Sequence, residues 1–182
     1  MVLLESIDIP LGSDINSFTL KGADGNMYSL DNFDTASGIV IIFMCNHCPY
    51  VQAIWERLVI LQDKYQEKGI QFIGVNPNLH PDYPEESLEK MKEYYDNYNM
   101  NFPYLQDDTQ DLAREYQAQC TPDIFVYNQE RKLFYHGRVD DNWQDEGQVT
   151  KNELDEALDM MLEGRGAPSQ QYPCIGCSIK WK

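Results

Sequence analysis

The run from Gly38 to Met44 (GIVIIFM) constrains the fold more than any other segment, because it is continuously apolar and rich in β-branched residues. Such a run is typical of a strand that is buried on both faces in the centre of a sheet. It stops at Cys45, and after Pro49 the apolar residues recur at helical spacing. A second buried strand, IQFIGVN (70–76), follows. The first junction of this strand-helix-strand unit therefore carries a C-x-x-C motif.

The remaining pattern adds strands and helices on both sides of this unit. The further expected elements are a hairpin over 18–30, a helix over 84–99, an extended segment at 102–107, a brief helix over 109–117 introduced by Thr109, two strands at 123–128 and 132–139, and a last helix over 152–164. Their alternation predicts an α/β fold with a mixed sheet and helices on both faces. With 182 residues, 42% of them hydrophobic, and no internal repeat, the chain predicts a single domain over 1–182.

The chain is strongly acidic, with a formal net charge of −16 at pH 7. This charge repels phosphate backbones and anionic lipid headgroups, so neither nucleic acid nor a membrane is an expected partner. No apolar run approaches the roughly 20 residues that cross a bilayer, and the first ten residues lack the pattern of a secretory signal. These observations predict a cytoplasmic protein, in which most thiols stay reduced. Five cysteines in that compartment need a chemical explanation.

Cys45 and Cys48 have the spacing of a redox couple. A C-x-x-C pair between a buried strand and a helix puts the first sulfur at the helix N-terminus, where unpaired N–H groups and the helix dipole stabilise a thiolate. The second sulfur is then close enough to close a small disulfide ring. His47 adds a positive charge or a donor that would lower the thiol pKa further, although a solvated loop histidine fits the same position. In a cytosolic β-α-β pattern this motif more often marks a thioredoxin-like redox site.

A second C-x-x-C pair, Cys174 and Cys177, lies in a C-terminal tail, 164–182, that is flanked by glycine and proline. Four cysteines would suffice for a zinc site, but the first pair sits at a strand-helix junction and not on a zinc knuckle, so no metal is expected. The tail is expected to be mobile or folded back. If it folds back, the second dithiol could pass electrons to the first as a relay; otherwise these are accessory thiols or a structural disulfide.

Pro122 is a further clue, because it directly precedes the apolar run DIFVYN (123–128). A proline there requires a strand start, an edge or a special bend, and a cis Thr121–Pro122 bond is one such bend, beside the more common trans form. In a thioredoxin-like arrangement this loop faces the cysteine pair, and the backbone of Thr121 can pair with an extended substrate. Cys120 would then lie nearby, and burial as a small apolar residue is its expected role.

Five segments carry a family resemblance: FTLKGADGNMYSLDNF, IVIIFMCNHCPYV, CTPDIFVYN, HGRVDDNW and IGCSIKWK. Together they resemble the peroxiredoxin-like branch of the AhpC/TSA (redoxin) group in the thioredoxin superfamily, over nearly the whole chain. The resemblance implies a thioredoxin-like fold, with a mixed central sheet flanked by helices and an N-terminal β-hairpin extension, and thiol-based redox chemistry. It also implies Cys45 as the exposed nucleophile, Cys48 as its partner and Pro122 as a cis-proline.

One departure separates this chain from true peroxiredoxins, whose motif P-x-x-x-(T/S)-x-x-C ends at the peroxidatic cysteine. With Cys48 in the last place, Ile41 stands where proline belongs and Cys45 where threonine or serine belongs. The departure favours thiol-disulfide exchange, in which Cys45 attacks a substrate disulfide and Cys48 releases the product. Peroxide reduction through a sulfenic acid and a non-catalytic thioredoxin-fold binding module, with or without zinc, are the alternatives.

The expected partners are protein or small-molecule disulfides, or a peroxide, together with a thiol reductant of the thioredoxin or glutathione system. No cofactor is expected. The residues expected at the site are Cys45, His47, Cys48, Thr121 and Pro122, with Cys174 and Cys177 as a relay. Arg138 is expected to form a surface ion pair with Asp140 or Asp141 and to take no part in catalysis.

Overall fold

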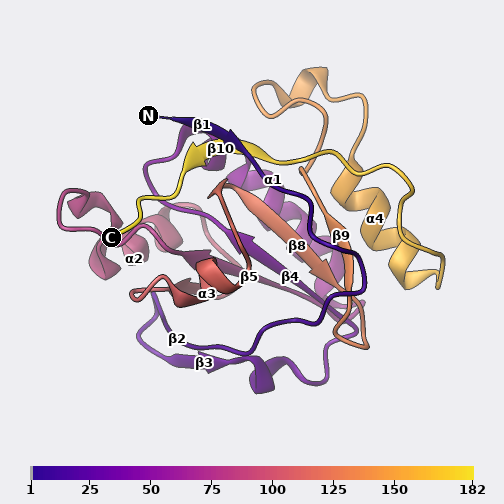
Figure 1. Ribbon diagram of the computed structural model, residues 1–182, viewed down its shortest axis with the longest axis horizontal. Helices are drawn as coiled ribbons and strands as arrows, with labels where there is room; N and C mark the ends of the chain where they lie inside the picture. The colour runs from indigo at the N-terminus through magenta and orange to yellow at the C-terminus, as the bar shows by residue number, and fades with distance from the viewer. Residues whose placement is uncertain (1) are drawn as a thin grey trace.

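A computed structural model describes residues 2–182 of the chain (Figure 1). Its centre is a seven-stranded sheet with the order β3-β2-β6-β5-β4-β8-β9. The strands are β2 (Thr19–Gly22), β3 (Met27–Ser29), β4 (Gly38–Phe43), β5 (Ile70–Asn76), β6 (Tyr104–Gln106), β8 (Asp123–Tyr127) and β9 (Leu133–His136). Because β4 is parallel to β5 and antiparallel to β8, the sheet is mixed, as predicted. The predicted N-terminal hairpin, β2 and β3, forms one edge of it.

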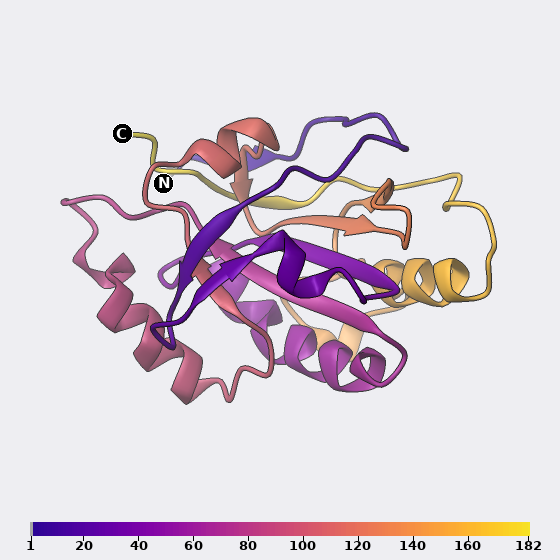
Figure 2. The same ribbon diagram turned by 90° about the horizontal axis from the view of Figure 1, so that it is seen from below.

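The helices cover both faces of this sheet. They are α1 (Pro49–Gln66), α2 (Leu88–Asn97), α3 (Asp111–Glu115) and α4 (Glu153–Leu162), with short 3-10 turns η1 (Leu30–Phe33), η2 (Pro84–Glu86) and η3 (Glu146–Gln148). Figure 2 shows α1, α2 and α4 on one side of the sheet and α3 on the other. Within residues 2–182, no helix combines the length and the apolar character that a membrane span requires.

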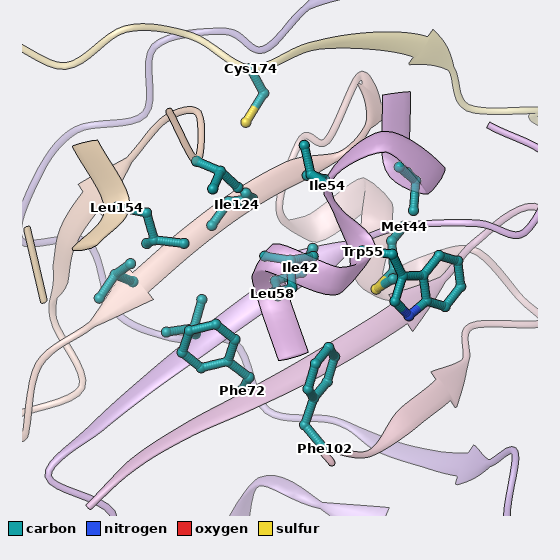
Figure 3. Packing of buried hydrophobic residues seen from close by; sticks show 14 of the residues in the cluster. Ile42, Met44, Ile54, Trp55, Leu58, Phe72, Phe102, Ile124, Leu154 and Cys174 are labelled. Carbon is teal, nitrogen blue, oxygen red and sulfur yellow. The ribbon is translucent and has the colours of Figure 1, made fainter. Parts of the chain in front are cut away.

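β4 organises the core because all six of its residues are buried. Successive side chains of a strand point to opposite faces, so Ile42 packs with α1, α2 and α4, whereas Ile41 packs with α3. Figure 3 shows Ile42 among Leu58 of α1 and Phe72 of β5, with Trp55 nearby. The central strand is therefore fixed from both sides, and with it the loop that follows Phe43.

A second sheet joins both chain ends to the domain. β10 (Ile175–Ser178) lies between β1 (Leu3–Glu5) and β7 (Cys120–Thr121) and is antiparallel to both (Figure 1). The end of the chain is thus folded back over the domain, which is the second of the two alternatives for the tail. Neither β1 nor β10 was expected from the sequence, since each is too short to show a period.

Gly176 allows β10 to approach β7. A Cβ atom at this position would collide with the backbone carbonyl of Thr121, which cannot rotate away. Beyond β10 the chain is anchored further, because the backbone N–H of Lys180 donates to the side chain of Asn78 at 2.9 Å and the amide of Gln110 donates to the Lys180 carbonyl at 2.8 Å. The C-terminal segment is consequently an integral part of the domain.

Two helix starts differ from their predictions. α2 begins at Leu88, with the Ser87 side chain as its cap, because η2 interrupts the predicted helix upstream. Thr109 does not introduce α3. Gln110 is the residue before that helix, in the left-handed region with φ 64°. The Gln110 side chain donates to the Lys180 carbonyl of the C-terminal segment, and a contact between such distant residues cannot be predicted from the local sequence.

Arg57 ties α1 to the loop that follows β9. Its guanidinium donates to the Asp140 carboxylate at 2.6 Å and to the carbonyls of Asn142 at 3.0 Å and Trp143 at 3.2 Å. The side chains of Arg57 and Asp140 are only 9% and 2% exposed. An unpaired charge in these buried surroundings would cost several kcal/mol, so this ion pair fixes the loop to the helix.

We expect Arg57→Ala to lower the free energy of unfolding by about 3–5 kcal/mol, since it leaves a buried carboxylate without its partner. Urea unfolding of the reduced protein measures the change. Arg165→Ala is the matched control, because that arginine pairs with Glu163 on the surface, where both side chains are more than half exposed. Equal losses in the two variants would contradict the expectation.

Candidate functional site

Residues 44–48 form the loop between β4 and α1 and include the C-x-x-C motif. Cys48 is the N-cap of α1, with extended backbone angles (φ −76°, ψ 117°), and Pro49 fills the first helical position, where its missing N–H costs nothing. Sequence reasoning placed the first sulfur at the mouth of the helix. The structure places the second sulfur there, because the chain needs the residues after Phe43 to turn from the strand into the helix.

Thr121 brings the sulfur atoms together. The Cys48 sulfur lies 3.0 Å from the Thr121 carbonyl oxygen, to which it donates while it is protonated, and the Cys45 sulfur lies 3.3 Å from the Thr121 hydroxyl. The Cys48 sulfur also lies 3.1 Å from that of Cys177. The Thr121–Pro122 bond is cis, which confirms the predicted geometry. Residues that are far apart in the sequence therefore form one compact site.

The two cysteines of the motif differ in their electrostatics. A hydrogen bond from the Cys45 thiol lowers the pKa of Cys48 to about 5, helped by Cys177 and opposed by burial. Burial raises the pKa of Cys45 well above its usual value, and the contact with Cys48 and the Glu86 charge act in the same direction. Both residues are 0% exposed. Cys45 is therefore buried and not exposed as expected, and the lowered pKa is that of Cys48, with Cys45 as its hydrogen-bond donor.

A buried carboxylate, Glu86, fixes the loop. One oxygen accepts the backbone N–H of Asn46 at 2.9 Å and the side-chain amide of Asn76 at 2.7 Å. The other accepts the backbone N–H of His47 at 2.8 Å and bonds to the His47 ring at 2.5 Å. Glu86 is 0% exposed. Three of these bonds hold the motif, and the fourth ties Glu86 to Asn76 at the end of β5.

His47 is part of this network and is not a solvated loop residue. Its hydrogen bond to Glu86 raises its pKa, against the effect of burial. The ring also stacks on Tyr83, with 5.3 Å between the centroids. His47 therefore pairs with Glu86, while a ring nitrogen also lies within 4.8 Å of the Cys45 sulfur, and its expected action on a thiol stays a prediction.

A metal centre fits this arrangement poorly. Ligand atoms of Cys45, His47 and Glu86 lie within 4.8 Å of one another, which is compatible with a metal ion. However, both carboxylate oxygens already accept two hydrogen bonds each, so an ion would have to break the bonds that hold the loop. In the part of the chain that the structure describes, no metal-ligand cluster combines cysteines of both C-x-x-C motifs.

Cys174 and Cys177 do not form a dithiol. Side chains three apart on an extended strand point to opposite faces, with Cα atoms about 10 Å apart, whereas a disulfide needs at most about 7 Å. Cys177 reaches Cys48, while the Cys174 thiol donates to the Gly137 carbonyl at 3.0 Å. Figure 3 shows the Cys174 sulfur pointing into the apolar cluster near Ile54 and Ile124. Of the predicted relay pair, the structure thus brings Cys177 and not Cys174 into contact with Cys48.

Cys120 and Arg138 also lie close to the site. Cys120 is buried, as predicted, and burial raises its pKa. Arg138 pairs with Glu153 at 2.6 Å and lies over the ring of Tyr172. The expected pairs with Asp140 and Asp141 do not form, because Arg57 takes the first carboxylate and Thr150 bonds to the second. Arg138 thus supports the loop after β9.

A cavity of about 50 Å³ opens beside the cysteine motif. Tyr50 and Trp143, whose rings are in contact, line it together with Pro122, Pro173 and Cys174. Neither Cys45 nor Cys48 contributes to its walls. The cavity therefore adjoins the thiol site without opening directly onto the thiolate.

Sequence reasoning missed Glu86 and Asn76. Asn76 carried a weak signal in the sequence. It is a polar residue at the end of the apolar strand β5, and β5 pairs with β4, the strand that leads into the motif. Glu86 carried none, since it is one of two adjacent glutamates in a polar turn and only the fold shows which of them is buried.

Comparison with known proteins places this geometry in a family. Residues 11–136 match the AhpC/TSA family. The chain belongs to the AhpC/TSA family. It is similar over 100% of its length, and 97% of the other chain, to the structure of an uncharacterized conserved protein from Geobacillus kaustophilus, with 42% identity and a TM-score of 0.95. No curated protein matches the sequence.

More distant structures show the fold of this AhpC/TSA protein. One is a thiol:disulfide interchange protein of the thioredoxin family from Chlorobium tepidum TLS, with 18% identity and a TM-score of 0.66 over 86% of this chain and 99% of that one. Another is peroxidoxin BcpB from Mycobacterium tuberculosis, with 15% identity and a TM-score of 0.59 over 86% and 96%. The fold is thioredoxin-like, as the sequence resemblance implied.

As the pH is raised, we expect the ultraviolet thiolate absorbance of the reduced protein to increase with a midpoint near pH 5. The Cys48→Ser variant should lack this step. The pKa of Cys48 falls from its ordinary value of 9.0 to about 5 on folding. The unfolded chain therefore binds more protons between these values, and stability should rise with pH across that window and be lost below about pH 5. A midpoint near 9 would contradict the assignment of the thiolate to Cys48.

We expect Glu86→Gln to lower the pKa of His47, which nuclear magnetic resonance of the ring measures directly. The raised pKa gives the folded protein stability that is present below the ordinary histidine value of 6.5 and is lost as pH rises through the raised value. That pH-dependent part should disappear from the variant. Glu89→Gln, an exposed position on α2, is the control, and an unchanged His47 titration in Glu86→Gln would refute the ion pair.

Proposed function

We propose that this AhpC/TSA protein is a thiol-disulfide oxidoreductase in which Cys48 supplies the attacking thiolate and Cys45 the second thiol. The observation that carries the proposal is the place of Cys48 at the start of α1, with its pKa lowered by the Cys45 thiol. A thiolate is the reactive form of cysteine, and a helix N-terminus favours negative charge. The roles of the two cysteines are thus the reverse of those expected from the resemblance.

In the proposed reaction, the Cys48 thiolate attacks one sulfur of a substrate disulfide, and the other sulfur leaves as a thiolate that takes up a proton. The Cys45 thiol then loses its proton and attacks the Cys48 sulfur, which releases the second product thiol and closes a Cys45–Cys48 disulfide. Two electrons pass to the substrate, and a thiol reductant of the thioredoxin or glutathione system returns them. We place this cycle in the cytoplasm, where such reductants are maintained.

The surrounding groups fit these roles. The negative charge of Glu86 helps to raise the pKa of Cys45, so this thiol stays protonated and donates to Cys48 in the resting state. Thr121 holds both sulfurs through its carbonyl and its hydroxyl. One cysteine is therefore prepared to attack first and the other to act second.

Peroxide reduction is the second candidate, and the burial of Cys48 is the observation that favours it. A peroxide is small enough to reach an enclosed thiolate with little rearrangement. In this reaction the Cys48 thiolate would attack a peroxide oxygen, and the O–O bond would break so that the other oxygen leaves as an alcohol or water after taking up a proton. The resulting sulfenic acid would condense with the Cys45 thiol and release water. The Cys45–Cys48 disulfide is the same in both routes.

We expect Cys48→Ser to reduce turnover by roughly 100-fold or more, because it removes the nucleophile. Cys45→Ser should retain the first attack by Cys48 but should be unable to close the Cys45–Cys48 disulfide. Reduction of oxidised glutathione and insulin measures exchange, and consumption of hydrogen peroxide with a thiol donor measures the second route. Cys120→Ser is the buried-cysteine control. Full activity of Cys48→Ser in both assays would overturn the proposed function.

A further inference from the structure

The contact between Cys48 and Cys177 is not used by the reaction described above. Their sulfurs lie 3.1 Å apart, so a bond of about 2.05 Å requires them to approach by only about 1 Å. Both residues are 0% exposed, which shields the contact from solvent. A thiol at this distance from a nucleophilic thiolate is within reach of any sulfur bond that Cys48 forms.

The position of Cys177 follows from the register of β10. Cys177 pairs with Thr121 and Ser178 with Cys120, so β10 covers the strand whose carbonyl accepts the Cys48 thiol. An extended substrate that paired with Thr121 would need the same backbone groups. β10 thus occupies the position beside Thr121 that such a substrate would take, and Cys177 is placed as a cysteine of that substrate would be.

Several contacts hold this segment in place. Ser178 donates its backbone N–H to Val2 at 2.9 Å and Ile179 donates to Gln119 at 3.1 Å, on either side of the site. The bonds of Lys180 to Asn78 and Gln110 continue the anchorage. The contact between Cys48 and Cys177 is therefore built into the fold.

We propose that Cys177 is a third redox-active thiol, which resolves bonds on Cys48 in competition with Cys45. This inference rests on the proposed function. When a small disulfide has formed a mixed disulfide with Cys48, the Cys177 thiol loses its proton and attacks the Cys48 sulfur; the small thiolate leaves and a Cys48–Cys177 disulfide forms. From a Cys48 sulfenic acid, the same attack releases water. From a Cys45–Cys48 disulfide, it releases the Cys45 thiolate without net oxidation.

The same geometry indicates a substrate class. Because β10 covers β7, an extended polypeptide cannot pair with Thr121 while the segment is docked. The oxidants that reach Cys48 in this state are small molecules, namely a low-molecular-weight disulfide or a peroxide. Oxidation to Cys48–Cys177 then ties β10 covalently to the start of α1.

The test is disulfide mapping by mass spectrometry after exposure of the reduced protein to oxidised glutathione or to hydrogen peroxide. In Cys45→Ser, we expect a Cys48–Cys177 disulfide to form in most molecules. In Cys45→Ser/Cys177→Ser, the glutathione adduct should instead persist on Cys48. Cys174→Ser is the matched control for loss of a tail thiol, since its sulfur bonds to Gly137, and it should behave as the unmodified chain does.

A second variant separates docking from chemistry. Gly176→Ala keeps every thiol but cannot seat β10 against Thr121. In Cys45→Ser/Gly176→Ala, we expect the Cys48–Cys177 disulfide to form severalfold more slowly than in Cys45→Ser. The same Gly176→Ala change alone should raise the rate with insulin severalfold relative to the rate with oxidised glutathione.

The outcomes distinguish this inference from the proposed function. If Cys45→Ser retains the glutathione adduct on Cys48 while Cys177 remains open to alkylation, the role of Cys177 is refuted and the Cys45–Cys48 cycle stands. An equal insulin-to-glutathione preference with and without Gly176→Ala would refute the covering role of β10. If neither oxidant modifies Cys48 in the unmodified chain, both proposals fail together.

Discussion

The structure depends on one residue, Thr121, where three distant segments meet. Its carbonyl contacts the Cys48 sulfur, its hydroxyl contacts Cys45, and its backbone pairs with Cys177. The seven-stranded sheet brings it there, because β8 lies directly beside β4 and carries β7 at its start. Since these contacts are buried, a shift of this backbone would disturb the electrostatics and the packing of the site together.

The site holds two negatively charged groups, the Glu86 carboxylate and the Cys48 thiolate, at separate positions. Glu86 holds the loop through backbone amides and an ion pair with His47, while Cys48 carries its charge at the helix N-terminus. Burial contributes most to the raised pKa of Cys45, and the contact with Cys48 and the Glu86 charge raise it further, so its proton is retained. The asymmetry of the motif thus comes from its neighbours, because two cysteines of equal intrinsic acidity are placed in unlike fields.

The central elements and the fold were predictable because their signals are local. β4 and β5 are continuous apolar runs, α1 has helical spacing after a proline, and the family resemblance covers the segments around Cys48 and Pro122. What remained hidden depends on contacts between distant residues. The burial of Glu86, the pairing of β10 and the order of acidity within the motif all arise only once the sheet is assembled.

The two C-x-x-C pairs also show that the same sequence spacing gives different sulfur positions in different backbone conformations. At the turn into α1, two intervening residues bring Cys45 and Cys48 into hydrogen-bonding contact, whereas on the extended β10 segment the same spacing sends Cys174 and Cys177 to opposite faces. The C-terminal pair therefore contributes one sulfur to the site and not two. Three sulfurs can share only one disulfide among themselves, so a disulfide within the site always leaves one thiol. Oxidation of this kind never empties the site of thiols; it only decides which sulfur keeps its proton.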